Sequence, residues 1–102
     1  MPPFEVRLTL EAEEDLLRLF NVLLALDLDL AIAARSAIEK SLAILEHSPF
    51  TCRKAAGGDL GPFVRELLIS FGASGYLALF EITDAQHVTV LALRHQREDD
   101  YH

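Results

Sequence analysis

The residues best suited to chemistry lie close to the end of the chain. Between positions 94 and 101 the sequence places two arginines, a histidine and a tyrosine: Arg94, His95, Arg97 and Tyr101. Cleavage of RNA needs a base for the 2′-hydroxyl, an acid for the leaving oxygen and cations for the developing charge. The acidic run at positions 98–100 would repel a phosphate backbone. We therefore favour an interpretation in which the arginines pair with these acids and the surface binds protein.

Arg65 is a second candidate, because it is the only charged residue on an apolar face of its predicted strand. A buried cation needs a partner or must open into a cleft, since burying it unpaired is costly. Two interpretations remain open. Arg65 forms an ion pair with a carboxylate of the neighbouring strand, such as Glu81, or its planar guanidinium clamps a phosphate or carboxylate of a partner.

The charge balance is acidic, with nine lysines and arginines against sixteen aspartates and glutamates and a formal net charge of −7. Proteins that hold nucleic acid by its phosphates need clustered cations. The composition therefore disfavours direct nucleic-acid binding as the main activity.

Cys52 is the only cysteine, which fits a reducing cytoplasm. Its neighbours Arg53 and Lys54 would favour a reactive thiolate, but no catalytic signature surrounds it, so we interpret it as a spectator. The four histidines lack metal-ligand spacing and no glycine-rich phosphate motif occurs, so neither metal nor cofactor is expected. The longest apolar runs are too short for a membrane span and no secretory signal is visible, so we expect a cytoplasmic protein.

A length of 102 residues predicts one domain, residues 1–102. A strand is expected over Phe4–Thr9, where apolar and polar residues alternate. A helix follows, capped by Thr9 and running to about Leu26. A second helix runs from Leu30 to about His47, with Asp27 or Asp29 as its cap and Pro49 as its stop. The short connection makes the two helices an antiparallel hairpin.

Three further strands are expected at Phe63–Phe71, Tyr76–Thr83 and His87–His95, joined by short turns as a meander. The stretch from Pro49 to Pro62, which includes Arg53 and Lys54, is expected to be a loop. The predicted class is α+β in the order βααβββ, a helical hairpin on one face of a small, mainly antiparallel four-stranded sheet. Both faces of the strands are apolar, so a partner segment or a second copy should cover part of one face.

This arrangement resembles the RelE/ParE toxins of bacterial toxin–antitoxin modules. The likeness extends from Val6 to Tyr101, in family order and at family-like spacing. The residues that carry it are Val6–Thr9, Glu11–Leu16, Leu45 with Pro49, Val64–Leu67, Gly75–Ile82 and the closing Val90–Tyr101.

The resemblance implies one of two activities. RelE-like members cut messenger RNA in the ribosomal A site, whereas ParE-like members are associated with poisoning of DNA gyrase. By the resemblance, Arg65 matches the family's central-strand arginine and Tyr101 its terminal tyrosine. His95 stands where many RNA-cutting relatives have a catalytic arginine, and the basic loop pair is reduced to Arg53-Lys54. These departures and the acidic charge favour the ParE side.

The leading hypothesis is therefore a ParE-like toxin that binds DNA gyrase and is neutralised by a cognate antitoxin. The resemblance implies that this antitoxin is a small dimeric DNA-binding protein whose carboxy-terminal segment wraps the toxin. Two alternatives remain, a ribosome-dependent endoribonuclease using Arg65, His95, Arg97 and Tyr101, and an inactive binding module. The residues expected to contact the target are Arg53, Lys54, Arg65, Tyr76, Arg94, His95, Arg97 and Tyr101.

Overall fold

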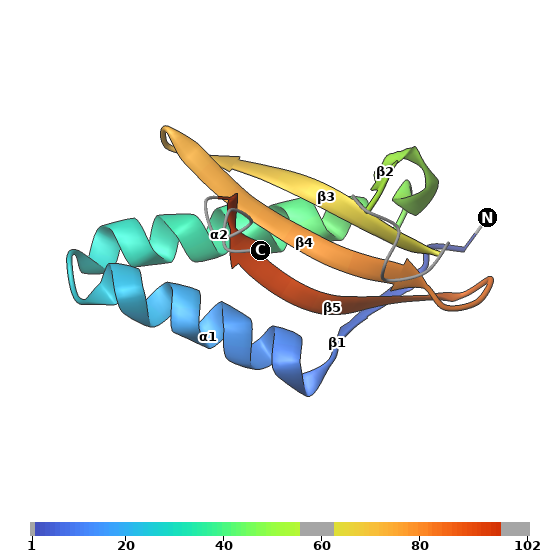
Figure 1. Ribbon diagram of the computed structural model, residues 1–102, viewed down its shortest axis with the longest axis horizontal. Coiled ribbons are helices and arrows are strands. Elements are labelled where there is room, and N and C mark those ends of the chain that lie inside the picture. Colours follow the sequence, from blue (N-terminus) through green and yellow to red (C-terminus); the bar gives the residue numbers. More distant parts are fainter. Residues whose placement is uncertain (1, 56–62, 97–102) are drawn as a thin grey trace.

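Two helices pack side by side against one face of a five-stranded mixed sheet (Figure 1). The computed structural model describes residues 2–55 and 63–96. Along the chain the elements are β1, α1, α2, a short 3-10 turn η1, and then β2 to β5. The α+β class is confirmed, with one more strand than expected.

Both helices begin at the side chains that cap them. Helix α1 spans Leu10–Leu24, and the Thr9 hydroxyl accepts a hydrogen bond from the Ala12 N–H at 3.1 Å. Helix α2 spans Leu28–Ile44, and its cap is Asp27, whose carboxylate accepts the Asp29 N–H at 2.8 Å. It ends three residues earlier than expected, and η1 at Pro49–Thr51 follows after a short turn.

The strand order is β1-β5-β4-β3-β2. Strand β1 (Glu5–Leu8) runs parallel to β5 (His87–His95), while β3 (Val64–Phe71), β4 (Ser74–Ile82) and β5 form the expected antiparallel meander. The prediction of an uninterrupted loop before β3 was wrong. Arg53–Lys54 form β2, which pairs with β3 and adds the fifth strand. A two-residue strand is too short to show the alternation by which strands are recognised.

A bulge in β5 sets which residues reach the core. Leu79 pairs with Ala92 and Phe80 with Val90, so Leu91 has no partner on β4. The extra residue turns both Val90 and Leu93 toward the helices, where both are fully buried. The side chains of Thr9 and of Asp15 in α1 make hydrogen bonds to the irregular backbone of β5 at the bulge. The Thr9 hydroxyl donates to the Leu91 carbonyl at 3.3 Å, and Asp15 accepts the Leu93 N–H at 3.0 Å.

The main core lies between the sheet and the helices, with α1 packed on β5 and α2 on β3. Its largest fully buried side chains include Phe80, Ile38, Leu45 and Ile69. The opposite face of the sheet carries Val64, Leu77 and Leu79, which are also buried, and Leu68, which is half exposed.

Gly75 is needed for the close approach of β3 and β4. A Cβ atom at this position would overlap the backbone carbonyl of Ile69, and a backbone group cannot rotate away as a side chain can. We expect Gly75→Ala to lower the free energy of unfolding by about 3 kcal/mol, as overpacking does. Urea denaturation measures the loss. Ser70 is the exposed register partner of Gly75, so Ser70→Ala should change stability by no more than about 0.5 kcal/mol. Equal stability of the two variants would contradict this account.

Candidate functional site

Arg65 lies near the amino end of β3, where η1 folds against the sheet. Its Nη1 donates to the Cys52 carbonyl at 2.6 Å and, more weakly, to the Phe50 carbonyl at 3.5 Å. The guanidinium carbon is 6.0 Å from the centroid of the Phe50 ring. The suggested ion pair with Glu81 does not form, because Glu81 pairs with Val64 in the sheet register and so lies on the face opposite Arg65.

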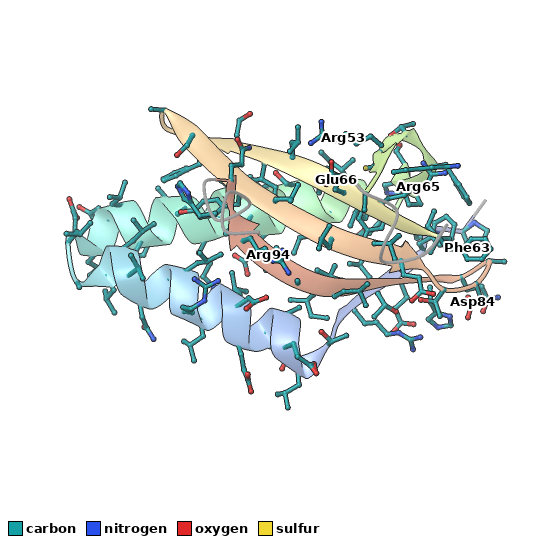
Figure 2. The ribbon with its side chains drawn as sticks, viewed as in Figure 1. Arg53, Phe63, Arg65, Glu66, Asp84 and Arg94 are labelled. Carbon is teal, nitrogen blue, oxygen red and sulfur yellow. The ribbon has the colours of Figure 1, made fainter. Side chains whose placement is uncertain are left out.

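Beside Arg65 the surface is hollowed over about 280 Å³. We call this hollow the Arg65 pocket. Phe63 and Asp84 lie at the same end of the sheet as Arg65 (Figure 2), and both phenyl rings in the lining are exposed. Of the guanidinium nitrogens of Arg65, only Nη1 donates a hydrogen bond to an acceptor among the described residues. The lining residues are Phe50, Phe63, Arg65, Ile82, Asp84 and Ala85.

Asp84 gives the Arg65 pocket a negative charge at its other side. Its carboxylate accepts the Gln86 N–H at 2.7 Å and lies 2.8 Å from Nδ1 of His87. The hydrogen bond from Gln86, helped by that from His87, holds the pKa of Asp84 below its usual value. The pocket thus combines two aromatic rings, a cation and a carboxylate, which suits an apolar side chain flanked by charged groups of a partner protein.

Cys52 is not activated by this arrangement. Burial raises the pKa of its thiol, and the nearby Arg65 only partly opposes that shift. The thiol therefore stays protonated at neutral pH, which agrees with its interpretation as a spectator.

Arg53 on β2 forms an ion pair with Glu66, whose side chain is only 6% exposed. Figure 2 shows both residues at the β3 edge of the sheet. Glu66 is the one buried charged residue in residues 2–55 and 63–96. Arg53 thus neutralises a buried carboxylate, although its own side chain is exposed like that of the neighbouring Lys54.

We expect Arg53→Ala to lower the free energy of unfolding by about 2 kcal/mol, because it leaves the Glu66 carboxylate buried without its cation. Replacing Glu66 by glutamine in the same chain should recover part of the loss, since a neutral amide costs less to bury. Lys54→Ala, one position along the same strand, is the control and should be close to neutral. The measurement is the urea midpoint of each of the three variants. An Arg53→Ala midpoint equal to that of Lys54→Ala would contradict a stabilising role for the Arg53–Glu66 pair.

The expected cluster at the end of β5 is split between two faces of the sheet. Arg94 pairs with Leu77 and His95 with Tyr76, so their side chains point in opposite directions. His95 lies on the helix side, where its Nε2 is 3.0 Å from the Ser74 hydroxyl. Arg94 is partly exposed on the other face (Figure 2). Arg97 and Tyr101 lie outside the described residues.

Tyr76 is a core residue, which corrects its assignment to the target-binding set. Its side chain is 4% exposed and packs against the rings of Phe71 and His95, with centroids 6.1 and 5.6 Å away. Burial also raises the pKa of its phenol. The side chain therefore supports the fold and is not presented to a partner.

Arg65 and His95 do not belong to one site. Across β4, Arg65 pairs with Phe80 and His95 with Tyr76, four residues away along the strand. At about 3.3 Å per residue and 4.8 Å per strand, their backbones are roughly 16 Å apart. Their side chains are also held apart, because the Arg65 guanidinium bonds to carbonyls of η1 whereas the His95 imidazole contacts Ser74.

Sequence reasoning missed Phe50, Phe63 and Asp84 as neighbours of Arg65. A signal was present, because Phe63 directly precedes the strand and Phe50 follows the proline that ends the helical hairpin. What joins them is the β2–β3 pairing and the fold of η1, which the sequence pattern did not indicate.

Within the described part of the chain, no three His, Cys, Asp or Glu side chains gather as a metal ion would require. None of the helices in that part is both long enough and apolar enough to cross a membrane.

Comparison with known proteins assigns the fold and the family. The toxin–antitoxin pair titled "Chromosomal ParDE TA system from P. aeruginosa" has a chain that is 17% identical, with a TM-score of 0.73, covering 90% of this chain and 95% of that one. A chain of the toxin–antitoxin complex RelBE2 from Mycobacterium tuberculosis is 24% identical, with a TM-score of 0.61 and 94% of each chain covered. No curated protein sequence matches. Residues 6–100 match the sequence model described as the ParE toxin of the type II toxin–antitoxin system parDE. The chain therefore belongs to the ParE toxin family of type II toxin–antitoxin systems.

Proposed function

We propose that this ParE-like toxin stops growth by binding a target protein in the cytoplasm, DNA gyrase, and that a cognate antitoxin neutralises it. The Arg65 pocket carries the proposal. It offers a fixed guanidinium between two exposed aromatic rings, and arginine and aromatic side chains are the types that dominate the energy of protein interfaces. The net charge of −7 favours a protein target over a phosphate backbone.

The enzymatic alternative needs an acid, a base and cations around one phosphodiester. Arg65 and His95 have separate contacts, with η1 and with Ser74, and Arg94 is on the other face of the sheet from His95, which speaks against one shared site. A mechanism based on binding does not require an acid, a base and cations in one place. It needs only a surface that binds the target, and the Arg65 pocket is our candidate for that surface.

The antitoxin part of the proposal is supported by the two solved structures, both titled as toxin–antitoxin systems or complexes. The described residues also expose large apolar side chains on α2 and at the pocket. Such surfaces normally mark contacts with another protein. We infer that the antitoxin is a small dimeric DNA-binding protein whose carboxy-terminal segment wraps this chain.

The test is induction of the chain in a bacterial host, alone and together with the small reading frame beside its gene. We expect growth to stop when the chain is induced alone and to continue when both are made. A pull-down from the co-expressing cells should recover the two proteins as a complex. If the chain alone does not affect growth, the proposal is overturned, and the inactive binding module becomes the favoured interpretation.

A ribosome-dependent endoribonuclease is the second candidate, favoured by the likeness to a chain of the RelBE2 complex and by the hydrogen-bonded His95. His95→Ala separates the two activities. The substitution would abolish growth arrest if His95 took part in RNA cleavage. Under our proposal the arrest persists, because His95 lies far from the Arg65 pocket.

A further inference from the structure

Helix α1 has a second apolar face that the fold leaves uncovered. Leu10, Leu17 and Leu24 are 66%, 59% and 41% exposed, whereas Ala12 and Leu19 on the inner side are buried. Residues seven apart fall almost on one line of a helix, so these three leucines form a row about 21 Å long. We call them the leucine row. Figure 1 shows α1 along the border of the molecule, with α2 and the sheet on one side of it.

A groove runs beside the leucine row, next to α2. It holds a hollow of about 240 Å³ lined by Glu13, Leu16, Leu17, Phe20, Asn21 and Arg35. The Arg35 guanidinium lies 5.8 Å from the centroid of the Phe20 ring and 3.7 Å from Glu39. Charges are unequally divided along α1. Its first half carries Glu11, Glu13, Glu14 and Asp15, and its second half carries no carboxylate.

We propose that this face binds a second copy of the chain, with the two α1 helices antiparallel and a two-fold axis passing beside Leu17. The spacing of the leucine row is the same in both directions from Leu17. Leu17 therefore packs on Leu17 of the second copy, and Leu10 of each copy packs on Leu24 of the other. Leucines repeated every seven residues fit another helix at a shallow crossing angle.

The charges select the antiparallel arrangement. About the axis at Leu17, Glu13 of one copy comes level with Asn21 of the other and lies on the same side of the interface as Phe20 of that copy. Phe20 and Asn21 line the groove that holds Arg35, so the Glu13 carboxylate of each copy approaches the Arg35 guanidinium of the other. A parallel pair would instead place Glu13 and Glu14 against the same residues of the second copy, and like charges repel.

One helix from each copy makes a small interface, below the roughly 1,600 Å² typical of stable complexes. The association should therefore be reversible and depend on protein concentration. It is independent of the proposed function, because a monomer can arrest growth and an inactive chain can still dimerise.

Disulfide cross-linking tests the position of the axis. In a Cys52→Ser background, made by cell-free synthesis, Leu17→Cys should form a covalent dimer with itself under mild oxidation. Leu10→Cys should not cross-link alone but should do so when mixed with Leu24→Cys. Val22→Cys, exposed on the same helix but off the row, is the matched control and should remain monomeric. Cross-linking of Leu10→Cys alone, or no preference for position 17 over 22, overturns the proposal.

Sedimentation equilibrium supplies the second test. Leu17→Glu should raise the dimer dissociation constant roughly a hundredfold, because it removes two leucines from the axis and adds two like charges. Arg35→Glu and Glu13→Arg should each weaken the dimer, and the two substitutions combined should restore it. Circular dichroism checks that each variant is folded. A parent chain that stays monomeric up to about 1 mM contradicts the proposal, and leaves the leucine row to another partner.

Discussion

Replacing Phe80 by alanine is expected to lower the free energy of unfolding by about 3–5 kcal/mol. Phe80 is the largest fully buried side chain among the described residues, and it lies on the face of β4 that the helices cover. Removing its ring loses the apolar contacts and leaves a cavity that the surrounding backbone cannot fill. A domain of about 100 residues is usually stable by only 5–15 kcal/mol, so the variant should be close to unfolding at 37 °C.

Urea denaturation followed by circular dichroism measures the change, and Leu68→Ala is the matched control. Leu68 is a large apolar residue of the same sheet but is half exposed on the opposite face, so its loss should be at most about 1 kcal/mol. A Phe80→Ala variant no less stable than Leu68→Ala would show that the core does not lie between β4 and the helices.

Phe63→Ala is expected to weaken binding to the cellular target by about 2 kcal/mol, which is roughly thirtyfold, without lowering stability. The Phe63 ring is exposed at the edge of the Arg65 pocket. Its loss therefore creates no cavity in the core, while a partner seated in the pocket loses an aromatic contact. Arg65→Ala should weaken binding too, but it also releases the carbonyls of Phe50 and Cys52. Phe63 is therefore the cleaner probe.

Growth inhibition at graded induction measures this effect, together with pull-down of gyrase by the tagged chain. Leu68→Ala again provides the control, as an exposed apolar residue on β3 away from the pocket. If both variants inhibit growth as strongly as the parent chain, the Arg65 pocket is not the target-binding surface. If both lose activity equally, the effect is not specific to the pocket.

The elements with long periodic patterns were predicted accurately from the sequence. The Thr9 cap, the helical hairpin and the strand at His87–His95 are confirmed, because each depends on local hydrogen bonding or on alternation over many residues. Strand β2 and the bulge at Leu91 were not predictable in this way. Both depend on pairing with distant strands, which local spacing does not encode.

The surroundings of the candidate site were harder to predict than the fold, because they too depend on contacts between distant parts of the chain. The sequence singled out Arg65 as the only charge on its strand face, but its partners are backbone carbonyls of η1, which no side-chain pattern reveals. Arg94 and His95 are adjacent in sequence, yet a strand directs neighbouring side chains to opposite faces. Tyr76 was expected to contact the target because it fitted the family pattern. In the structure its side chain is buried in the core between the sheet and the helices.

The most direct test of the account is to follow labelled thymidine and labelled methionine after the chain is induced alone in a bacterial host. We predict that DNA synthesis fails first while protein synthesis continues, as expected of a toxin that binds gyrase through the Arg65 pocket. Early collapse of methionine incorporation, with thymidine incorporation unaffected, would contradict the account. That result would favour the ribosome-dependent endoribonuclease.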